Sequence, residues 1–281
     1  MGCRNCKHLV DDNVVVNNSA NNDINTISDR FAIPDEDEET TFSQMIHYVH
    51  RFLWQGNYSS PIVERLNAGN ARILNVGCGP GPGCWLLNMA REYRWDNFFG
   101  VDVNPSVFPT NVSDLNAIFL KLDTLERLPF AAETFDFVFL RFVSFTEEQW
   151  QTKVVNELVR VCKRGGWIEI MDCENEFYNR GVTTNRLITA CSQFVRLLRE
   201  TDQIDSIKRE EKECFLGNEG GRAGQYLLRD FELNLQSPRV IMSETMGCTN
   251  EEYEDLIQEF HNEVKRLNTS IKYVRVYGQK N

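Results

Sequence analysis

The stretch Ile73-Leu-Asn-Val-Gly-Cys-Gly-Pro-Gly-Pro-Gly83 runs from a short apolar segment into a loop rich in glycine. Glycines at positions 77, 79 and 81 let the backbone turn sharply and approach a ligand where a Cβ atom would collide. Residues 85–90 then show a helical pattern, and the first N–H groups of a helix are free to bind a ligand. This order predicts a buried strand, a ligand-binding loop and a helix.

The spacing of the glycines distinguishes between classes of cofactor. Dinucleotide-binding folds use the pattern G-x-G-x-x-G, with a pyrophosphate at the helix N-terminus. Here the third glycine of that pattern would fall on Pro82 or on Cys84, which disfavours a dinucleotide oxidoreductase. The spacing G-x-G-x-G fits better with a cofactor that has no phosphate and whose sulfonium and amino-acid tail lie beside the loop.

Two aspartates stand at the ends of the next predicted strands. The segment Phe-Phe-Gly-Val-Asp102 places a carboxylate where Rossmann-like folds hold ribose hydroxyls. A third apolar strand leads to Asp123 and Thr124, where a carboxylate can accept a hydrogen bond from an adenine amino group. Each aspartate alone is more often a turn residue or a helix cap. Three signals in register at successive strand ends favour a nucleotide-like ligand.

The order of these motifs resembles that of the class I S-adenosylmethionine-dependent methyltransferases across residues 72–172. It continues with Leu-Pro-Phe130, Phe-Asp-Phe-Val138 and, before Trp167, Glu-Leu-Val-Arg-Val-Cys-Lys-Arg-Gly-Gly. The resemblance implies S-adenosylmethionine as the cofactor, with its methionine part at the glycines, its ribose at the second strand end and its adenine at the third. The cofactor-binding residues expected from it are Asn75, Gly77, Cys78, Gly79, Gly81, Asp102, Val103, Asp123, Thr124 and Arg141.

Two residues depart from the pattern of that family. Asn75 stands where the family usually has an acid near the cofactor's amino group, so a charge is lost and cofactor affinity is expected to fall. Arg164 replaces the proline that commonly precedes the Gly165-Gly166 turn into the fifth strand. The C-terminal segment Val-Arg-Val-Tyr-Gly-Gln-Lys280 is weakly similar to fungal methyltransferases linked to secondary metabolism.

The alternation of apolar and helical segments predicts an α/β protein with a parallel sheet. The resemblance specifies a Rossmann-like, seven-stranded, mostly parallel sheet with helices on both faces. The sixth strand has two candidates, residues 226–235 and residues 239–244. The other strands are expected at residues 73–76, 98–101, 118–122, 135–140, 167–171 and 271–277, and helices at 42–54, 83–93, 147–162, 184–200 and 249–267.

The N-terminal part differs in composition from the rest. Residues 1–40 are rich in Asn and Asp and end in an acidic run, which is typical of a disordered tail. Thr41 and Gln44 form a capping-box pattern ahead of a helix that we expect to cover the cofactor side as a lid. The expected organisation is a tail at 1–40, a lid segment at 41–60 and a methyltransferase domain at 61–281, with its cofactor core at 72–172 and its substrate side at 173–281.

Methyl transfer from a sulfonium needs alignment above all, so no universal catalytic residue is expected. His47, His50 and Tyr58 lie in the lid segment and could act as a base. Both histidines fall mostly off the apolar face of their helix and are predicted to be solvated. No Asn/Asp-Pro-Pro-aromatic motif follows the fourth strand, which disfavours methylation of nucleic-acid amines. Further candidates at strand ends that face the cofactor are Arg141, Phe142, Asp172 and Glu174.

The composition limits the possible partners. A formal net charge of −11 disfavours binding to a phosphate backbone, because that affinity comes mainly from Lys and Arg. We expect a small-molecule acceptor, or else a protein side chain, and no nucleic acid; the alternative function is a cofactor-binding pseudoenzyme that regulates a partner. No metal site is expected, since the Cys3-x-x-Cys6 pair has no second pair at ligand spacing.

The cysteine content and hydropathy indicate a cellular location. Nine cysteines without a signal-peptide pattern are typical of reduced intracellular thiols, and no apolar run is long enough to span a bilayer. We expect a cytoplasmic protein, with the nucleus as an alternative. The Met1-Gly-Cys start leaves an acylated membrane anchor as a further alternative, although Cys6 stands where the acylation pattern has Ser or Thr. The sequence leaves the oligomeric state open.

Overall fold

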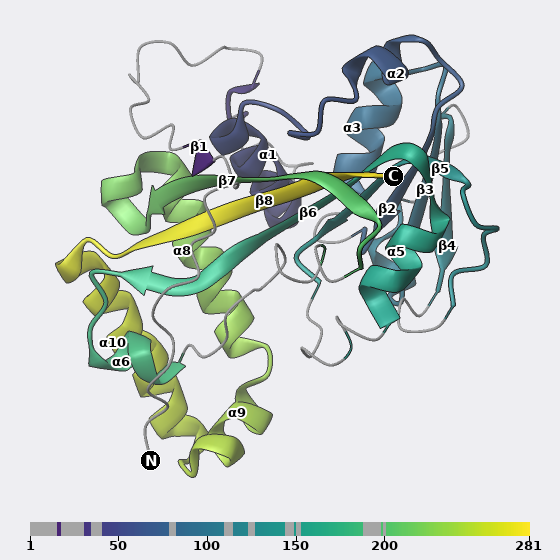
Figure 1. The fold of residues 1–281 in the computed structure, drawn as a ribbon. Helices are drawn as coiled ribbons and strands as arrows, with labels where there is room; N and C mark the ends of the chain where they lie inside the picture. Colours follow the sequence, from purple (N-terminus) through teal and green to yellow (C-terminus); the bar gives the residue numbers. More distant parts are fainter. Residues whose placement is uncertain are drawn as a thin grey trace.

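The computed structural model shows one twisted sheet with helices packed against both of its faces (Figure 1). It describes residues 16–17, 31–34, 41–78, 83–109, 115–122, 127–143, 149, 153–187, 198 and 201–281. The eight strands follow the order β1-β7-β8-β6-β5-β2-β3-β4 across the sheet. Their bounds are β1 Val16–Asn17, β2 Arg72–Val76, β3 Asn97–Asp102, β4 Ala117–Lys121, β5 Phe135–Arg141, β6 Cys162–Tyr178, β7 Ile204–Phe215 and β8 Ser270–Lys280.

The sheet is parallel except at β8. This strand pairs antiparallel with both β6 and β7, whereas the other pairs in the described sheet are parallel. The predicted Rossmann-like α/β class is therefore confirmed. The sheet has eight strands rather than seven because β1, a two-residue strand, pairs with β7 at the edge. Apart from β1 and residues 31–34, the predicted tail lies outside the described residues.

The helices divide between the two faces of the sheet. Side chains of α1, α3, α8 and α10 share one buried cluster with residues of the sheet, while α5 packs in a second cluster on the opposite face. The helix bounds are α1 Phe42–Trp54, α2 Val63–Asn67, α3 Cys84–Glu92, α5 Val155–Val161, α6 Val182–Leu187, α8 Gly221–Gln236, α9 Arg239–Met246 and α10 Asn250–Leu267, with short 3-10 turns η3 Pro105–Val107 and η5 Gly217–Gly220.

Strand β5 lies at the centre and is buried along its whole length. Successive side chains of a strand point to opposite faces, so Phe137 and Phe139 join the cluster under α1 and α3 while Val138 and Leu140 join the α5 cluster. The ring of Phe139 stacks on Trp85 of α3 with centroids 4.2 Å apart. Burial of each such side chain stabilises the fold by about 1.5–3 kcal/mol, so both faces hold the strand in place.

Helix α1 begins at the predicted capping box. The Thr41 hydroxyl accepts a hydrogen bond from the backbone N–H of Gln44, and the Gln44 side chain accepts one from the backbone N–H of Thr41. The helix ends at Trp54 because Gln55 turns the chain with a φ of 49°. Its apolar residues pack against α3 and α8. The predicted helix at 42–54 is confirmed.

The sixth strand was misplaced by both sequence candidates. Residues 226–235 lie in helix α8 and residues 239–244 lie in α9, whereas the strand is β7. β7 is flanked only by β8 and the short β1, so a central strand's apolar pattern is not required of it. Ile204 and Cys214 are its only buried side chains, and charged residues fill most positions between them. That charge pattern conceals the strand in the sequence.

The remaining elements follow the predictions with shifted bounds. The strands expected at 73–76, 98–101, 118–122, 135–140, 167–171 and 271–277 correspond to β2, β3, β4, β5, β6 and β8, and the helices at 83–93 and 249–267 correspond to α3 and α10. The helix expected at 147–162 is α5 within the described residues, and that expected at 184–200 begins as α6, with residues 188–197 outside the description. The Gly165-Gly166 turn lies within β6, where the pairing with β5 shifts register.

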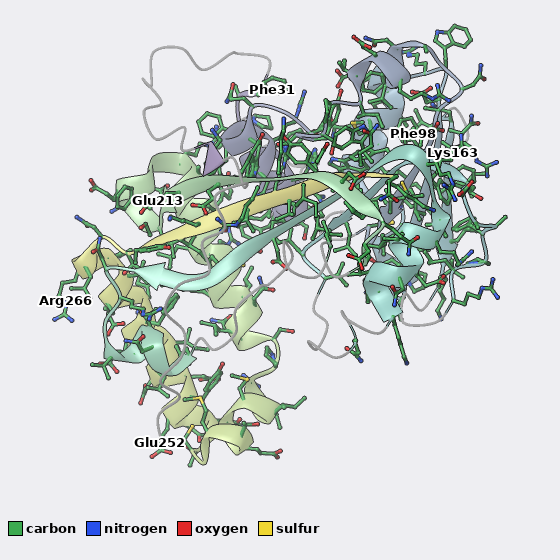
Figure 2. All side chains as sticks on the ribbon, viewed as in Figure 1. Phe31, Phe98, Lys163, Glu213, Glu252 and Arg266 are labelled. Atoms are coloured by element: carbon green, nitrogen blue, oxygen red, sulfur yellow. The ribbon has the colours of Figure 1, made fainter. Side chains whose placement is uncertain are left out.

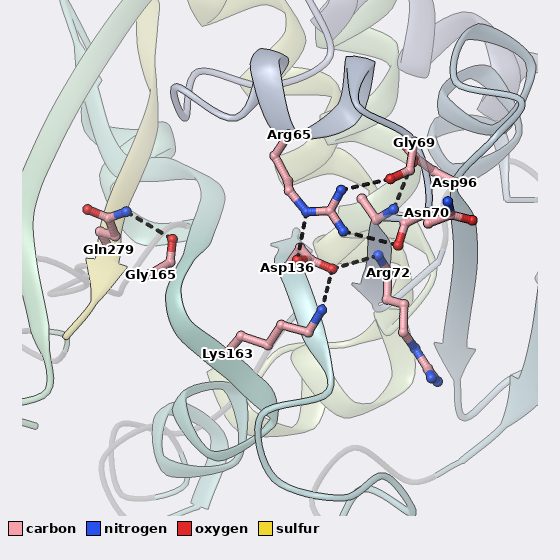
Figure 3. Close-up of polar contacts among 10 residues, drawn as sticks. Arg65, Gly69, Asn70, Arg72, Asp96, Asp136, Lys163, Gly165 and Gln279 are labelled. Carbon is pink, nitrogen blue, oxygen red and sulfur yellow. Dashed lines mark hydrogen bonds and ion pairs between the residues drawn. The ribbon is translucent and has the colours of Figure 1, made fainter.

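A polar network holds together the edge of the sheet where β2 and β5 begin (Figure 3). Asp136 accepts hydrogen bonds from Arg65 Nε at 2.9 Å, from the backbone N–H of Arg72 at 2.9 Å and from Lys163 Nζ at 2.8 Å. Burial alone would raise the pKa of Asp136, but the three donors lower it below its usual value. Arg65 also donates to the carbonyls of Gly69 and Asn70. These contacts attach α2 to the sheet.

The C-terminal helices extend from the end of the sheet where β8 begins (Figure 1). Phe98 lies among the side chains packed on the sheet, whereas Glu252 and Arg266 project from the two ends of α10 (Figure 2). Acidic residues near its start and basic residues near its end suit the dipole of this helix. Within the described part of the chain, no helix has the length and apolarity needed to cross a membrane.

Candidate active site

The C-terminal ends of β2, β3 and β5 meet at one edge of the sheet. In the register, Val76 pairs with Val101 on one side and with Leu140 on the other, so the residues after each strand are neighbours. In open α/β sheets, ligands bind in the crevice outside these strand ends. The order across the edge is Asp102 on β3, Gly77 after β2 and Arg141 on β5.

Gly77 occupies a position that excludes a side chain. Its φ is 72°, and a Cβ there would lie 2.3 Å from Val143 Cγ2. Its backbone N–H donates to the carbonyl of Val101 at 2.9 Å, which fixes the turn out of β2 against β3. Gly83 at the start of α3 also has a positive φ, and a Cβ there would meet the ring of Phe119 at 2.5 Å. Gly79 and Gly81 lie outside the described residues.

Cys78 and Asn75 turn their side chains into the protein. The Cys78 thiol lies 3.4 Å from the carbonyl of Val101, and burial raises its pKa, so it stays a neutral thiol. The Asn75 amide donates to the carbonyl of Phe139 at 3.3 Å, and its buried Oδ1 has no partner among the described residues. Cys78 can therefore meet a ligand through its backbone, and Asn75 through one free acceptor.

Asp102 and Val103 lie on the open side of the edge. The half-buried Asp102 carboxylate accepts a hydrogen bond from the backbone N–H of Asn104 at 2.9 Å. Val103 exposes 60% of its surface, which is unusual for an apolar side chain beside a strand end and leaves it able to cover a flat ring. Asp123 and Thr124, predicted to meet the adenine, lie outside the described residues.

Arg141 ends β5 and is almost completely buried, with 2% of its surface exposed. Its Nη1 lies 3.3 Å from His47 Nδ1 of α1. The other edge of the guanidinium, Nε with Nη2, has no hydrogen-bond partner among the described residues. Burial lowers the pKa of Arg141 to about 10, so the group still carries its charge at neutral pH.

Comparison with known proteins agrees with this geometry. The family model described as "Methyltransferase domain" matches residues 73–166, the span from β2 to the start of β6. The chain contains a class I S-adenosylmethionine-dependent methyltransferase domain. S-adenosylmethionine is the cofactor of this family, as the sequence predicted.

The relatives of this methyltransferase domain include fungal proteins. The chain is 30% identical over 103 residues to methyltransferase str3 of Strobilurus tenacellus, covering 37% of this chain and 35% of that one. It is 27% identical over 143 residues to methyltransferase str2 of the same organism, covering 50% and 48%. The matches thus span at most about half of these relatives. A putative sarcosine dimethylglycine methyltransferase from Galdieria sulphuraria has the same fold, with a TM-score of 0.50, 12% identity and coverage of 83% and 85%.

His47 and His50 of α1 are buried, which contradicts the prediction that they are solvated. His47 Nε2 lies 3.1 Å from the Asn88 side-chain amide, and His50 lies between the rings of Phe142 and Tyr273, with centroids 4.6 and 4.8 Å away. Burial, followed by the charge of Arg141, lowers the pKa of both histidines well below the usual value. Helix α1 buries its polar face because that face covers the strand ends.

The other candidate bases differ in suitability. The Tyr58 hydroxyl lies 2.8 Å from that of Tyr93, and burial raises its pKa, so it is unsuited to act as a base at neutral pH. Asp172 was expected at a strand end but lies within β6, which continues to Tyr178, and it accepts a hydrogen bond from the backbone N–H of Cys173 at 2.8 Å. Burial raises the pKa of Asp172 to about 6. Glu174 is part of β6, but its side chain lies outside the description.

A buried ion pair that sequence reasoning missed attaches the lid segment to the domain. Glu169 in β6 is fully buried and accepts hydrogen bonds from the backbone N–H groups of Ser59 and Ser60 and from the Ser60 hydroxyl. Arg275 Nε of β8 lies 3.5 Å from its Oε1. The guanidinium also lies over the ring of Trp54, at 4.5 Å from the centroid. A charge inside each of two apolar strands is the sequence signal that could have revealed this pair.

Proposed function

We propose that this protein transfers the methyl group of S-adenosylmethionine to a small-molecule acceptor bound beneath helix α1. The carrying observation is the convergence of the Gly77 turn and Asp102 at adjoining strand ends, in a domain of this family. Alignment of donor and acceptor is the main requirement of an in-line displacement, so a covered site on rigid strand ends suits it.

The residues of the edge fit the expected cofactor. The positive φ of Gly77 turns the chain out of β2 into the loop proposed for the methionine part, and Asn75 offers a buried acceptor that has no partner among the described residues. Asp102 suits the ribose hydroxyls, and the exposed Val103 suits one face of the adenine ring. When bound, the cofactor supplies a methyl group on a sulfonium, and the sulfur leaves as a neutral thioether. Gly79, Gly81, Asp123 and Thr124 complete the proposed set.

The acceptor is proposed to be small because α1 covers the strand ends. Residues of α1 that face the sheet are buried, and the Glu169 contacts fix the chain that follows the helix. A protein side chain is the second choice, since it would have to enter beneath the same helix. The net charge of −11 argues against nucleic acid.

Isothermal calorimetry with S-adenosylhomocysteine and S-adenosylmethionine tests the proposal. Both nucleosides are expected to bind at one site, and Asp102→Asn is expected to weaken them by about 10- to 100-fold, since a charged acceptor is lost. Asp205→Asn, at an exposed position of β7, is the matched control and should leave affinity unchanged. Absence of binding by either nucleoside, or saturable binding of NAD instead, would contradict the proposal.

A further inference from the structure

The guanidinium of Arg141 is a buried charge for which the described protein provides no anion. No carboxylate forms an ion pair or a hydrogen bond with it among the described residues, and its Nε and Nη2 atoms have no partner there. Its hydrogen-bond partner among the described residues, His47 Nδ1, is an uncharged acceptor, because a guanidinium only donates and the imidazole must keep a lone pair. An unpaired buried charge is strongly unfavourable, which points to an anionic ligand.

The free edge of Arg141 has the geometry that binds one carboxylate. Nε and Nη2 present two parallel N–H groups, which match the two oxygens of a carboxylate side-on. Arg160 of the same protein uses this edge, donating from Nε and Nη2 to the two Glu157 oxygens at 2.7 Å each. At Arg141 the equivalent edge is buried and has no hydrogen-bond partner among the described residues.

The surroundings of Arg141 leave the charge unbalanced. The thiols of Cys78 and Cys84 lie near Arg141, but burial raises the pKa of both and keeps them neutral. Helix α3 begins at Cys84, so the positive end of its dipole faces the same region. The imidazoles of His47 and His50 are neutral there. The Arg141 guanidinium and the positive end of the α3 dipole therefore both favour an anion at this edge.

The place of Arg141 favours the acceptor over the cofactor as the source of the carboxylate. Apart from Arg141 itself, which the resemblance placed with the cofactor, the residues proposed for the cofactor lie in or after β2 and β3 or follow β4 in the chain, and β5 lies on the other side of β2. Phe142, with a φ of 49°, turns the chain so that its ring meets His50 of α1 and Tyr273 of β8. This aromatic wall lies toward β6 and β8, the predicted substrate side.

We propose that Arg141 binds a carboxylate of the methyl acceptor side-on, and that the half-buried ring of Phe142, the next residue in the chain, packs against the planar apolar part of the same molecule. The acceptor is thus an aromatic or similarly flat carboxylic acid. This assignment rests on the proposed methyl transfer for the role of the molecule, but the anion site itself is a separate property of the fold.

Ligand-observed NMR with benzoate and its neutral isostere benzamide tests the site, using the full chain saturated with S-adenosylhomocysteine. Benzoate is expected to bind the wild type, and Arg141→Met is expected to weaken it by at least about tenfold, because two charge-assisted hydrogen bonds are lost. Arg141→Lys keeps the charge but not the paired donors, so its affinity for benzoate should lie between those of the wild type and Arg141→Met. Arg164→Gln, an exposed charge removal at the opposite edge of the sheet, is the control and should bind as the wild type does.

Two results would overturn the inference. The first is a wild type that does not bind benzoate, or binds it no better than benzamide or equally well after Arg141→Met. The second is found by calorimetry with 5′-methylthioadenosine, which lacks the amino-acid tail of S-adenosylhomocysteine. If Arg141→Met removes the preference for S-adenosylhomocysteine, the carboxylate belongs to the cofactor.

Failure of the proposed function gives a different pattern. In that case the wild type binds neither nucleoside, and the benzoate measurement is made on the protein without nucleoside. Retained benzoate binding that depends on Arg141 would then support the anion site while removing the methyl-transfer role. Thermal unfolding of each variant identifies any that fails to fold, and Arg141→Lys then stands in for Arg141→Met.

Discussion

Arg141 and Arg275 are both buried to the same extent, and burial lowers the pKa of each to about 10, yet their surroundings differ completely. Arg275 lies beside the Glu169 carboxylate, donates to the carbonyl of Gly56 at 3.2 Å and has the ring of Trp54 over it. Arg141 has one hydrogen-bond partner among the described residues, the imidazole Nδ1 of His47. The same residue type, equally buried in neighbouring parts of one sheet, is internally paired in one place and not in the other.

The difference shows how the two regions divide structure and function. Around Arg275 the protein supplies its own anion, so the interaction holds the lid segment onto β6 and β8 without a ligand. Around Arg141 the described residues supply one neutral acceptor and no anion, so two of its donor atoms are left for a ligand. The unsatisfied site is also the one at the strand ends where Rossmann-like folds bind ligands.

The largest expected effect comes from removing the internal anion. Glu169→Gln leaves Arg275 unpaired and the Ser59 and Ser60 donors poorly matched, so unfolding free energy should fall by about 3–5 kcal/mol. Urea unfolding measures it. Glu133→Gln removes a half-exposed carboxylate that pairs with Arg164 and should cost less than about 1 kcal/mol. Similar losses of unfolding free energy in both variants would mean that the buried Glu169 contributes no more to stability than an exposed carboxylate.

Substitution of Arg141 is expected to change the unfolding free energy in the opposite direction. Arg141→Met removes a buried charge that has no anionic partner in the described part of the chain, and it should raise the unfolding free energy of the ligand-free protein by about 1–4 kcal/mol. Arg141→Lys, which keeps a charge, should gain little. Urea unfolding measures both changes. A loss of stability in Arg141→Met would mean that the guanidinium has a partner within the protein.

Protonation of the histidines near Arg141 gives a smaller effect that depends on pH. His50 has a lowered pKa in the folded protein, so below the unfolded pKa of about 6.5 only the unfolded chain binds its proton. Its contribution to stability is therefore complete above that pH and is lost as the pH falls, by up to about 1.4 kcal/mol per pH unit. His50→Phe should lack this loss in urea unfolding between pH 7.5 and pH 5.

Other groups titrate in the same pH range, so the difference between proteins is the measured quantity. Asp172 and Asp230 have pKa values raised to about 6 by burial and act with the opposite sign, but they are common to wild type and variant. His261→Phe, which changes an imidazole on α10 that contacts Glu232, is the matched control. Equal pH slopes for His50→Phe and wild type would show that His50 is not held neutral.

The smallest expected loss of stability comes from removing the capping box of α1 or that of α10. Thr41→Ala at α1 and Thr249→Ala at α10 each remove a side-chain cap and should each cost about 1 kcal/mol of stability. Only α1 covers Arg141, so only Thr41→Ala should also weaken benzoate binding in the NMR assay. Equal effects of the two variants on benzoate would mean that α1 does not contribute to the anion site.

Much of the fold could be predicted because its strands are buried on both faces. β5 reads as an unbroken apolar run, and α1 and α10 each begin at a Thr cap with Gln44 or Glu252 three residues later. The charged β7 could not be predicted, because a strand beside a short edge strand keeps many charged side chains accessible. Periodicity detects burial, and it fails where a strand is held chiefly by backbone pairing.

The site was predicted in part for the same reason. Gly77 and Asp102 follow apolar strands at spacings that fix their place on the edge, so their positions could be foreseen, although their cofactor roles remain predictions. His47 and His50 were assigned to solvent because hydropathy treats a polar residue as exposed, while in the fold that face of α1 covers Arg141. The pairing of Glu169 with Arg275 depends on β8 lying beside β6, which no local pattern encodes.

Strand β8 lies between β6 and β7 although it follows both in the chain. During synthesis on the ribosome, β6 and β7 emerge before the strand that separates them, and neither can yet form its native pairing with β8. Glu169 likewise emerges long before Arg275 and must remain hydrated until then. Such a contact between distant parts of a chain is typically slow to form. Closure of the sheet and attachment of the lid segment are therefore late, coupled events in the life of the nascent chain.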